Sequence, residues 1–358
     1  MTNSKGDVYP AQQGYPRNQW YVVAFSSEVA ANTLSHRQVL DVPVLLYRTD
    51  AGHVVALHDR CPHRGLPLSM GKLVGDRVQC GYHGMQFGSD GRCAHVPSQK
   101  GTPAAMAVRN YPVIEQWQWL WIWMGDPAKA DPNLIPDHES LGLTRAGFTA
   151  SPFFMMEMHA NYQYLHDNLL DTSHLSFVHA GMLDTGEMAT STFWSKEEGN
   201  ILRLGRETPG LTFSGQMAQA FRLQENKLYD RQLIAEAYVP NIHAAKQCIR
   251  DPADSSAPPI ELHAINALTP ADRDHTYVFH AQATTYGNNC TEDDLAGVRH
   301  ILLQDKLVVE ALQQNYDVYR DSLEVSVASD SAGIRCRRII SQLIANEQHG
   351  ENVMAASR

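Results

Sequence analysis

The stretch that decides the fold begins at Cys61-Pro-His-Arg-Gly65 and ends at Cys80-Gly-Tyr-His-Gly84. It reads as C-x-H followed, after 16 residues, by C-x-x-H. A Rieske-type [2Fe–2S] cluster has two thiolates on one iron and two imidazoles on the other, and each half of this stretch supplies one of each. Two loops that face each other would bring these side chains together. We therefore predict that the cluster ligands are Cys61, His63, Cys80 and His83.

A structural zinc site is the alternative interpretation of these four residues. Zinc sites with two Cys and two His usually pair Cys with Cys in one loop and His with His in the other. Both loops are mixed here. Gly65, Gly81 and Gly84 also favour tight loops whose backbone amides approach the cluster sulfides. The pattern therefore favours the iron–sulfur cluster over zinc.

Short β-strands separated by turns are predicted around this stretch. Trp20–Ala24, Val42–Arg48 and His53–His58 are rich in β-branched and aromatic residues, and the last two flank a turn. A tryptophan recurs at every second position from 117 to 123, which predicts one strand over 113–124 with a packed aromatic face. These runs indicate an N-terminal all-β domain.

The rest of the chain predicts an α+β domain, in which an antiparallel sheet is covered by helices. Residues 162–173 are predicted to be helical, 195–290 alternate polar and apolar side chains, and an acidic start at 291 opens a long helix to about 319. At about 100–200 residues per domain, the length of 358 residues indicates two domains. We place an N-terminal tail at 1–17, the all-β domain at 18–125 and the α+β domain at 126–358.

A second group of candidate metal ligands lies near the start of the α+β domain. His174 and His179 are five residues apart, so on a regular helix they would point roughly 140° apart. They could bind one metal only if the helix ends between them, and we expect that break within 173–177. Alone, such a pair is more often two core histidines. The acidic and amide residues just upstream, Asp167, Asn168 and Asp171, favour a site.

An Fe(II) centre with two His and one carboxylate keeps coordination positions open for O₂ and substrate. The carboxylate would come from the long C-terminal helix, where Asp305 is the candidate and Glu310 the reserve. Read from the residues alone, Asp305 could equally be a solvated charge on a helix face. The sequence therefore leaves the third ligand open at this point.

Composition excludes some functions. The net charge of −10 disfavours a nucleic-acid binder, which would present a basic face. No apolar run reaches the roughly 18 residues needed to span a bilayer, and the first residues lack the apolar core of a signal peptide. We therefore expect no membrane partner and a cytoplasmic protein, whose six cysteines stay reduced.

Four motifs together resemble the oxygenase component of Rieske non-haem iron oxygenases, most of all the vanillate O-demethylase and dicamba monooxygenase group. They are Cys61-Pro-His-Arg-Gly, Cys80-Gly-Tyr-His-Gly, Asp167-Asn-Leu-Leu-Asp-Thr-Ser-His and Asp305-Lys-Leu-Val-Val-Glu. Gly81 and Met85 are typical of that group, because many ring-hydroxylating relatives have Pro and Trp there. The resemblance extends from Trp20 to about Glu347.

The resemblance implies roles for individual residues. His174, His179 and Asp305 would be the Fe(II) ligands, with Asn168 as a polar neighbour of the iron. Asp171 would carry electrons from His83 to His174, a step that crosses between subunits of a homotrimer in that family. We also expect the Asp171 carboxylate to hold His174 in one orientation.

The implied activity is monooxygenation of a small aromatic acid, with O-demethylation favoured and aromatic catabolism as the setting. Electrons from NAD(P)H would arrive through a reductase and a ferredoxin-type partner, with O₂ as co-substrate. A ring cis-dihydroxylating dioxygenase and an electron carrier without a second iron are the alternatives. An anionic substituent would be bound by side chains from the sheet, for which the candidates are Arg203, Arg206, Arg222, His243, Asn266 and His280.

Overall fold

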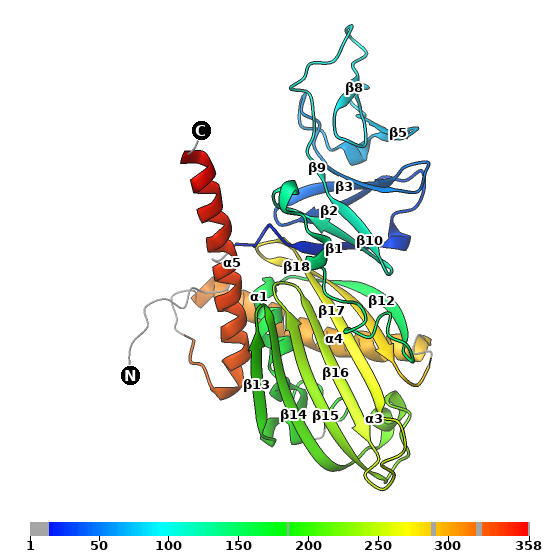
Figure 1. Ribbon diagram of the computed structural model, residues 1–358, viewed down its shortest axis with the longest axis vertical. Helices are drawn as coiled ribbons and strands as arrows, with labels where there is room; N and C mark the ends of the chain where they lie inside the picture. Colours follow the sequence, from blue (N-terminus) through cyan, green and yellow to red (C-terminus); the bar gives the residue numbers. More distant parts are fainter. Residues whose placement is uncertain (1–13, 185, 288–290, 320–323, 357–358) are drawn as a thin grey trace. The chain divides into compact units, whose positions relative to one another are not determined.

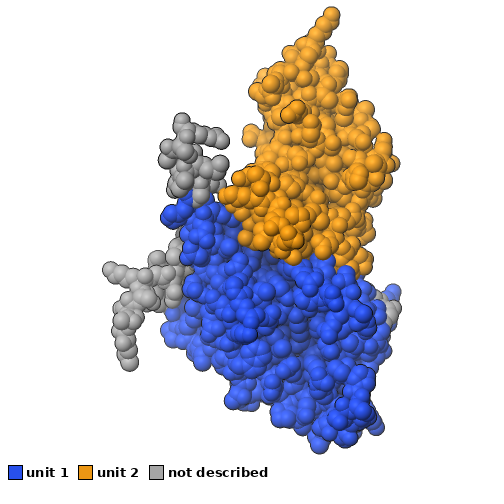
Figure 2. Space-filling view, in the orientation of Figure 1, with its two compact units in different colours: residues 1–16, 136–268, 273–358 blue, residues 17–135, 269–272 orange. Residues whose placement is uncertain are grey.

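The computed structural model describes residues 14–184, 186–287, 291–319 and 324–356. The chain divides into two units, coloured separately in Figure 2. Unit 2 comprises 17–135 and 269–272, and unit 1 comprises the remainder. The predicted fold class, an all-β domain followed by a domain with a large antiparallel sheet and helices, is confirmed.

Unit 2 is built from three small sheets (Figure 1). The first has the order β1 (Trp20–Phe25), β11 (Trp119–Trp123) and β10 (Val113–Gln116). The second has the order β2 (Ser35–Val39), β3 (Val42–Arg48), β4 (Val54–His58) and β9 (Asn110–Tyr111). The third has the order β5 (Lys72–Val74), β6 (Arg77–Gln79), β7 (Gln86–Phe87) and β8 (Cys93–His95).

The prediction of one strand over 113–124 is wrong. The chain turns at Trp117, which has a φ of 58°. β10 and β11 therefore form a hairpin, with Val113 opposite Ile122. The tryptophans of β11 still share one face and are fully buried, so the alternation does report packing. The alternation of tryptophans continues through the turn, so the sequence pattern gave no sign that the strand ends at Trp117.

Unit 1 contains a seven-stranded sheet whose strands run in nearly sequential order (Figure 1). Its order is β12 (Thr149–Met158), β18 (His275–Thr284), β17 (Ile260–Asp272), β16 (Ile242–Arg250), β15 (Leu228–Tyr238), β14 (Ile201–Thr212) and β13 (Phe193–Glu198). The last residues of β17, 269–272, belong to unit 2. Meander topology of this kind places neighbouring strands in register and fixes which side chains share a face.

Three main helices pack on this sheet: α1 (Tyr162–Leu170), α4 (Glu292–Tyr319) and α5 (Ser331–Ala356). Buried apolar side chains of β12, α1 and α4 form one core cluster, and those of α1, α5, β14 and β15 form another. Two short helices, α2 (Glu187–Thr190) and α3 (Gly215–Ala220), lie in the connections. Within the described residues, none of the helices combines the length and apolarity needed to cross a bilayer.

Candidate metal centres

The two cysteine loops of unit 2 have the same backbone hydrogen bonds. In the first loop the Cys61 amide donates to the Leu66 carbonyl (2.9 Å), and the Gly65 amide donates back to the Cys61 carbonyl (2.8 Å). The loop at 80–85 repeats both bonds at equivalent positions (2.8 and 3.1 Å). The fourth residue after each cysteine is a glycine with positive φ, 79° or 71°, which other residues rarely adopt. The two loops therefore share one backbone conformation.

These loops bring together the four residues predicted to hold the cluster. Cys61 and Cys80 are buried, with 3% and 2% of their surface exposed. His63 and His83 are exposed, and their Nδ1 atoms lie 3.2 Å apart. A buried thiol pair beside an exposed imidazole pair suits a cluster with one iron on the thiolates and the other on the histidines. Burial raises the pKa of Cys61, and the neighbouring Cys80 adds to this, so metal binding would displace a proton.

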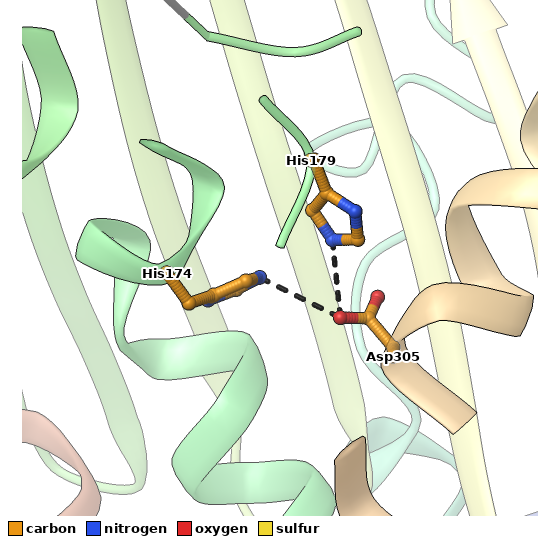
Figure 3. A group of neighbouring side chains, drawn as sticks. All are labelled: His174, His179 and Asp305. Atoms are coloured by element: carbon orange, nitrogen blue, oxygen red, sulfur yellow. Dashed lines mark hydrogen bonds and ion pairs between the residues drawn. The ribbon is translucent and has the colours of Figure 1, made fainter. Parts of the chain in front are cut away.

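A second group of ligands converges in unit 1 (Figure 3). His174, His179 and Asp305 each offer one ligand atom, and all three atoms lie within 4.8 Å of one another. Asp305 Oδ1 lies 3.1 Å from Nε2 of His179 and 3.6 Å from Nε2 of His174. Two imidazoles and one carboxylate are the donor set of a non-haem Fe(II) centre with open positions. The residues present therefore fit a mononuclear iron.

A break in the helix positions the two histidines. α1 ends at Leu170, and Asp171 is extended, with φ −99° and ψ 99°. A 3₁₀ helix, η6 (Thr172–Ser176), begins immediately afterwards and carries His174, while His179 follows its end. The helix therefore breaks twice, first at Asp171 and again after Ser176, and the second break separates the two histidines within the expected 173–177. The predicted continuous helix over 162–173 is wrong because the Asp171 carboxylate caps η6.

The expectation that the Asp171 carboxylate holds His174 is also wrong. This carboxylate accepts hydrogen bonds from the amide (2.8 Å) and hydroxyl (2.9 Å) of Ser173. It is the Asp171 backbone carbonyl that contacts Nδ1 of His174. A carbonyl can only accept, so Nδ1 carries the proton and Nε2 is left as the metal-binding nitrogen. The backbone therefore selects the tautomer.

Two amide side chains contact the three ligands, one at Asp305 and one at His179. Asn168 Nδ2 donates to Asp305 Oδ1 (3.1 Å), and Oε1 of Gln304 lies 2.8 Å from Nδ1 of His179. Gln304 was not among the predicted site residues, although it directly precedes Asp305. Both histidines thus have an oxygen partner on Nδ1 and present Nε2 to the same point.

The surroundings shift the pKa values of the two histidines in opposite directions. Burial is the largest influence on the pKa of His174 and lowers it, which favours the neutral ring that binds metal. Burial also acts to lower the pKa of His179, but the hydrogen bond and charge of Asp305 outweigh it and raise the pKa. A bound metal would take the place of the proton between His179 Nε2 and Asp305 Oδ1.

The remaining acidic candidates lie elsewhere. Glu310 accepts from the His159 amide (2.8 Å) and pairs with Lys306 (3.3 Å), so it is engaged away from the three ligands. Asp167 forms an ion pair with Arg337 of α5. Burial raises the pKa of Asp167 to about 6 despite this arginine. Asp167 therefore serves the packing of α1 on α5.

A cavity of about 670 Å³ adjoins the three ligands. It is lined by α4 and by alternate residues of β15 to β18, and Asn266 and His280 are among them. The described lining includes no arginine and no lysine. The expected cations are engaged with other side chains: Arg203 with Glu198 and Glu236, and Arg206 with Thr172 and Ser191. Arg222 lies beside two lining residues, Asp294 and Tyr286, and pairs with the Asp294 carboxylate. The candidate His243 contacts His166 instead (2.6 Å).

Two family models match the chain. The Rieske [2Fe–2S] domain covers 19–112, and the vanillate O-demethylase oxygenase C-terminal domain covers 158–346. The chain belongs to the Rieske non-haem iron oxygenases. The predicted resemblance is thereby confirmed. A bare electron carrier is excluded, because this Rieske oxygenase has the oxygenase domain as well as the Rieske [2Fe–2S] domain.

Known relatives place the oxygenase more narrowly. It is 32% identical to the dicamba O-demethylase oxygenase component of Stenotrophomonas maltophilia over 92% of this chain and 98% of that one. It is 28% identical to the vanillate O-demethylase oxygenase subunit of Pseudomonas sp. strain HR199, over 96% and 99%. The iron–sulfur subunit of the toluene-4-sulfonate monooxygenase system of Comamonas testosteroni is 44% identical, but that match spans 49% of each chain.

Solved structures agree with these relatives. Dicamba monooxygenase bound to 3,6-dichlorosalicylic acid superposes with a TM-score of 0.85 at 29% identity, covering 94% of this chain and 99% of that one. The same enzyme with non-haem iron and dicamba gives a TM-score of 0.79 at 30% identity, with the same coverage. The relatives are monooxygenase and demethylase components, so this Rieske oxygenase is a component of that kind rather than a dioxygenase.

Proposed function

We propose that this Rieske oxygenase is the terminal monooxygenase of a multicomponent system. It takes electrons from NAD(P)H through a separate reductase and a ferredoxin-type partner, and uses O₂ to oxygenate a small aromatic substrate. With an aryl methyl ether, hydroxylation of the methyl group releases formaldehyde and a phenol. The observation that supports this most is the meeting of His174, His179 and Asp305 at the edge of the 670 Å³ cavity.

The proposal gives each ligand set one task. Cys61, His63, Cys80 and His83 would hold the cluster, and the domain at 18–125 would be the electron-receiving part. The domain at 126–358 would hold the iron, which supplies O₂ activation at the positions that its three ligands leave open. Most of the proposed tail, 1–17, lies outside the described residues.

The residues around the iron site orient its ligands. The Asp171 carbonyl and Gln304 face Nδ1 of the two histidines and direct both Nε2 atoms inward. Asn168 holds Asp305 by donating to the oxygen that faces the histidines. The mainly apolar cavity wall excludes water around the reacting carbon, which limits side reactions.

The test uses the metal-loaded oxygenase with a surrogate reductase, NAD(P)H and ¹⁸O₂. A panel of methoxylated aromatic compounds is screened for substrate-dependent O₂ uptake. We expect formaldehyde in stoichiometry with the NAD(P)H consumed, because one oxygen atom enters the methyl group and the other is reduced to water. A cis-diol that carries two labelled oxygens, with no aldehyde, would contradict the proposal and restore the dioxygenase alternative.

We further propose that electrons pass from His83 of one subunit to His174 of the next through Asp171, within a homotrimer in the cytoplasm. His83 is exposed, and Asp171 lines a separate hollow of about 300 Å³ together with Glu324, Asp330 and Arg337. His83 and Asp171, the two residues between which the electron would cross, are therefore both accessible to a neighbouring copy. Size-exclusion chromatography with light scattering tests the trimer, and cell fractionation tests the compartment.

Replacing Asp171 with asparagine should slow electron transfer and leave both metals bound. Asparagine keeps the side-chain oxygen that caps η6 at Ser173, so the fold should survive. Removing the charge should lower turnover by about 10–100-fold. The measurement is the rate of cluster oxidation in a single turnover, with Glu324→Gln in the same hollow as the control. An active monomer, or an unchanged rate in Asp171→Asn, would count against the route.

A further inference from the structure

We infer that the substrate is an uncharged aromatic compound that donates hydrogen bonds, such as an aryl amide or a phenol, and that His280 and Gln247 select it over an aryl carboxylate. The inference rests on the proposed function, because it concerns the cavity beside the three ligands. It departs from the sequence-based expectation of an aromatic acid.

Small side chains form one wall of the cavity. Ala235, Ala245 and Ala264 line it from three neighbouring strands, β15, β16 and β17. Ala235 is paired with Ala245, and Ala245 with Ala264. Three methyl groups side by side on one face of a sheet leave a shallow apolar strip. A planar ring can lie on such a strip without displacing a larger side chain.

One side of the strip carries a hydrogen-bond acceptor. His280 Nδ1 lies 2.7 Å from the side-chain oxygen of Asn266, which can only accept, so Nδ1 carries the proton. Nε2 of the same ring is buried and has no hydrogen-bond partner among the described residues. The ring is held by edge and stacking contacts with Phe153 and Phe154, at 5.6 and 5.8 Å between centroids. Nε2 is therefore a fixed acceptor in a residue that lines the cavity.

Burial supports this protonation state, because it lowers the pKa of His280 to about 3. The ring is therefore neutral at physiological pH and offers no positive charge to an anion. A neutral imidazole with its proton on Nδ1 has one lone pair, on Nε2. A substrate N–H or O–H would satisfy that lone pair, whereas a carboxylate oxygen would face it with another lone pair.

The other side of the strip carries a second acceptor. Gln247 lines the cavity, and its Oε1 is buried with no hydrogen-bond partner among the described residues. Gln247 lies two residues from Ala245 in one direction, and Asn266 lies two residues from Ala264 in the other. At about 3.3 Å per residue, the two polar ends are about 13 Å apart along the backbone. Side chains that reach inward from both ends leave room for one substituted ring.

The charges along the cavity point the same way. The described lining has no arginine or lysine, and it includes Asp293 and Asp294 of α4, of which Asp294 already pairs with Arg222. An aryl carboxylate would lose its hydration on entering the cavity, and no lining cation would compensate for that loss, so its desolvation would be costly. An amide or phenol would instead satisfy buried acceptors that are otherwise unpaired. The cavity is thus complementary to a neutral donor.

Binding of isosteric probes tests the inference. The three positional isomers of methoxybenzamide are compared with the three methoxybenzoates by anaerobic calorimetric titration of the metal-loaded oxygenase. We expect at least one amide to bind about tenfold or more tightly than any benzoate. Equal or tighter binding of a benzoate would overturn the inference, and so would no binding of either series at millimolar concentration. Methoxybenzylamine is titrated as a further probe, and tighter binding of it than of every amide would also overturn the inference.

Iron content and the spectrum of the cluster are measured on the same samples. Protein that lacks the mononuclear iron or the cluster would count against the proposed function. Metal-loaded protein that consumes O₂ with a methoxybenzoate and prefers it would overturn the inference alone. The two failures are therefore distinguishable.

Two variants of one residue separate the acceptor from the packing. His280→Phe keeps an aromatic ring beside Phe153 and Phe154 but removes Nε2. The ratio of amide to benzoate affinity should therefore fall about tenfold. His280→Gln keeps an acceptor and should retain most of that preference. Both should keep the iron content of the parent protein. An unchanged preference in His280→Phe would show that Nε2 does not select the substrate.

Discussion

Replacing Asp305 with alanine is expected to remove the mononuclear iron and abolish turnover while the cluster stays in place. Asp305 supplies the single carboxylate of the three-ligand group, and its Oδ1 contacts His179 and Asn168. Without it, two neutral imidazoles remain, which bind Fe(II) far more weakly than the complete set. Iron should fall from about three atoms per chain to about two, and turnover by more than about 100-fold.

The control for this variant is Glu310→Ala on the same helix. Its carboxylate contacts the His159 amide and Lys306 rather than the histidines, so iron content and turnover should stay close to those of the parent protein. Metal analysis and the visible spectrum, measured on anaerobically purified protein, report the two centres separately. Full iron and activity in Asp305→Ala would require another carboxylate, and Glu310 would be tried first.

Cys80→Ser should have the complementary effect, loss of the cluster with retention of the mononuclear iron. A serine hydroxyl is a poor substitute for a thiolate, which is the soft ligand that iron–sulfur clusters require. The loop should keep its shape, because its two bonds, from the Cys80 amide to Met85 and from Gly84 to the Cys80 carbonyl, use backbone atoms. Brown colour and labile sulfide should disappear, about one iron per chain should remain, and NAD(P)H-driven turnover should stop.

Cys93→Ser is the matched control, because Cys93 is buried in β8 and lies outside the two loops. Its sulfur contacts the His95 carbonyl, which a serine hydroxyl can also reach. This variant should keep the cluster and its spectrum. A Cys80→Ser protein that stays brown, or a colourless parent protein with one zinc per chain, would overturn the assignment of the cluster ligands.

Local patterns were enough to predict much of the fold. β3 and β4 pair as the predicted hairpin, and α4 spans nearly the whole predicted helix, because turn residues and capping residues mark their ends. The hairpin at Trp117 and the break at Asp171 escaped prediction. In the first case the side-chain alternation continues through the turn, and in the second an acidic residue that suits a helix acts as a cap instead.

The candidate site was predictable where the ligands lie in short motifs and less so where they come from distant segments. The structure brings Asp305 to the two histidines, but nothing within residues 304–310 distinguishes it from a solvated charge. The sheet arginines show the same limit. Strand alternation does not reveal that Arg203 is neutralised by Glu236 or that Arg206 is used to hold Thr172. Such pairings depend on strand register, which is a property of the whole sheet.

Strand β17 has a consequence for recombination between relatives. Its residues 269–272 belong to unit 2 although the rest of the strand belongs to unit 1. There Pro270 and Ala271 accept from the amides of Leu40 and Asp41 (2.9 and 2.8 Å), and Thr269 donates to the Val22 carbonyl (2.6 Å). A crossover near residue 135 would therefore combine residues 17–135 of one relative with residues 269–272 of another. Chimeras that exchange 17–135 and 269–272 together would keep these bonds, and those made at a single junction would test their tolerance to mismatch.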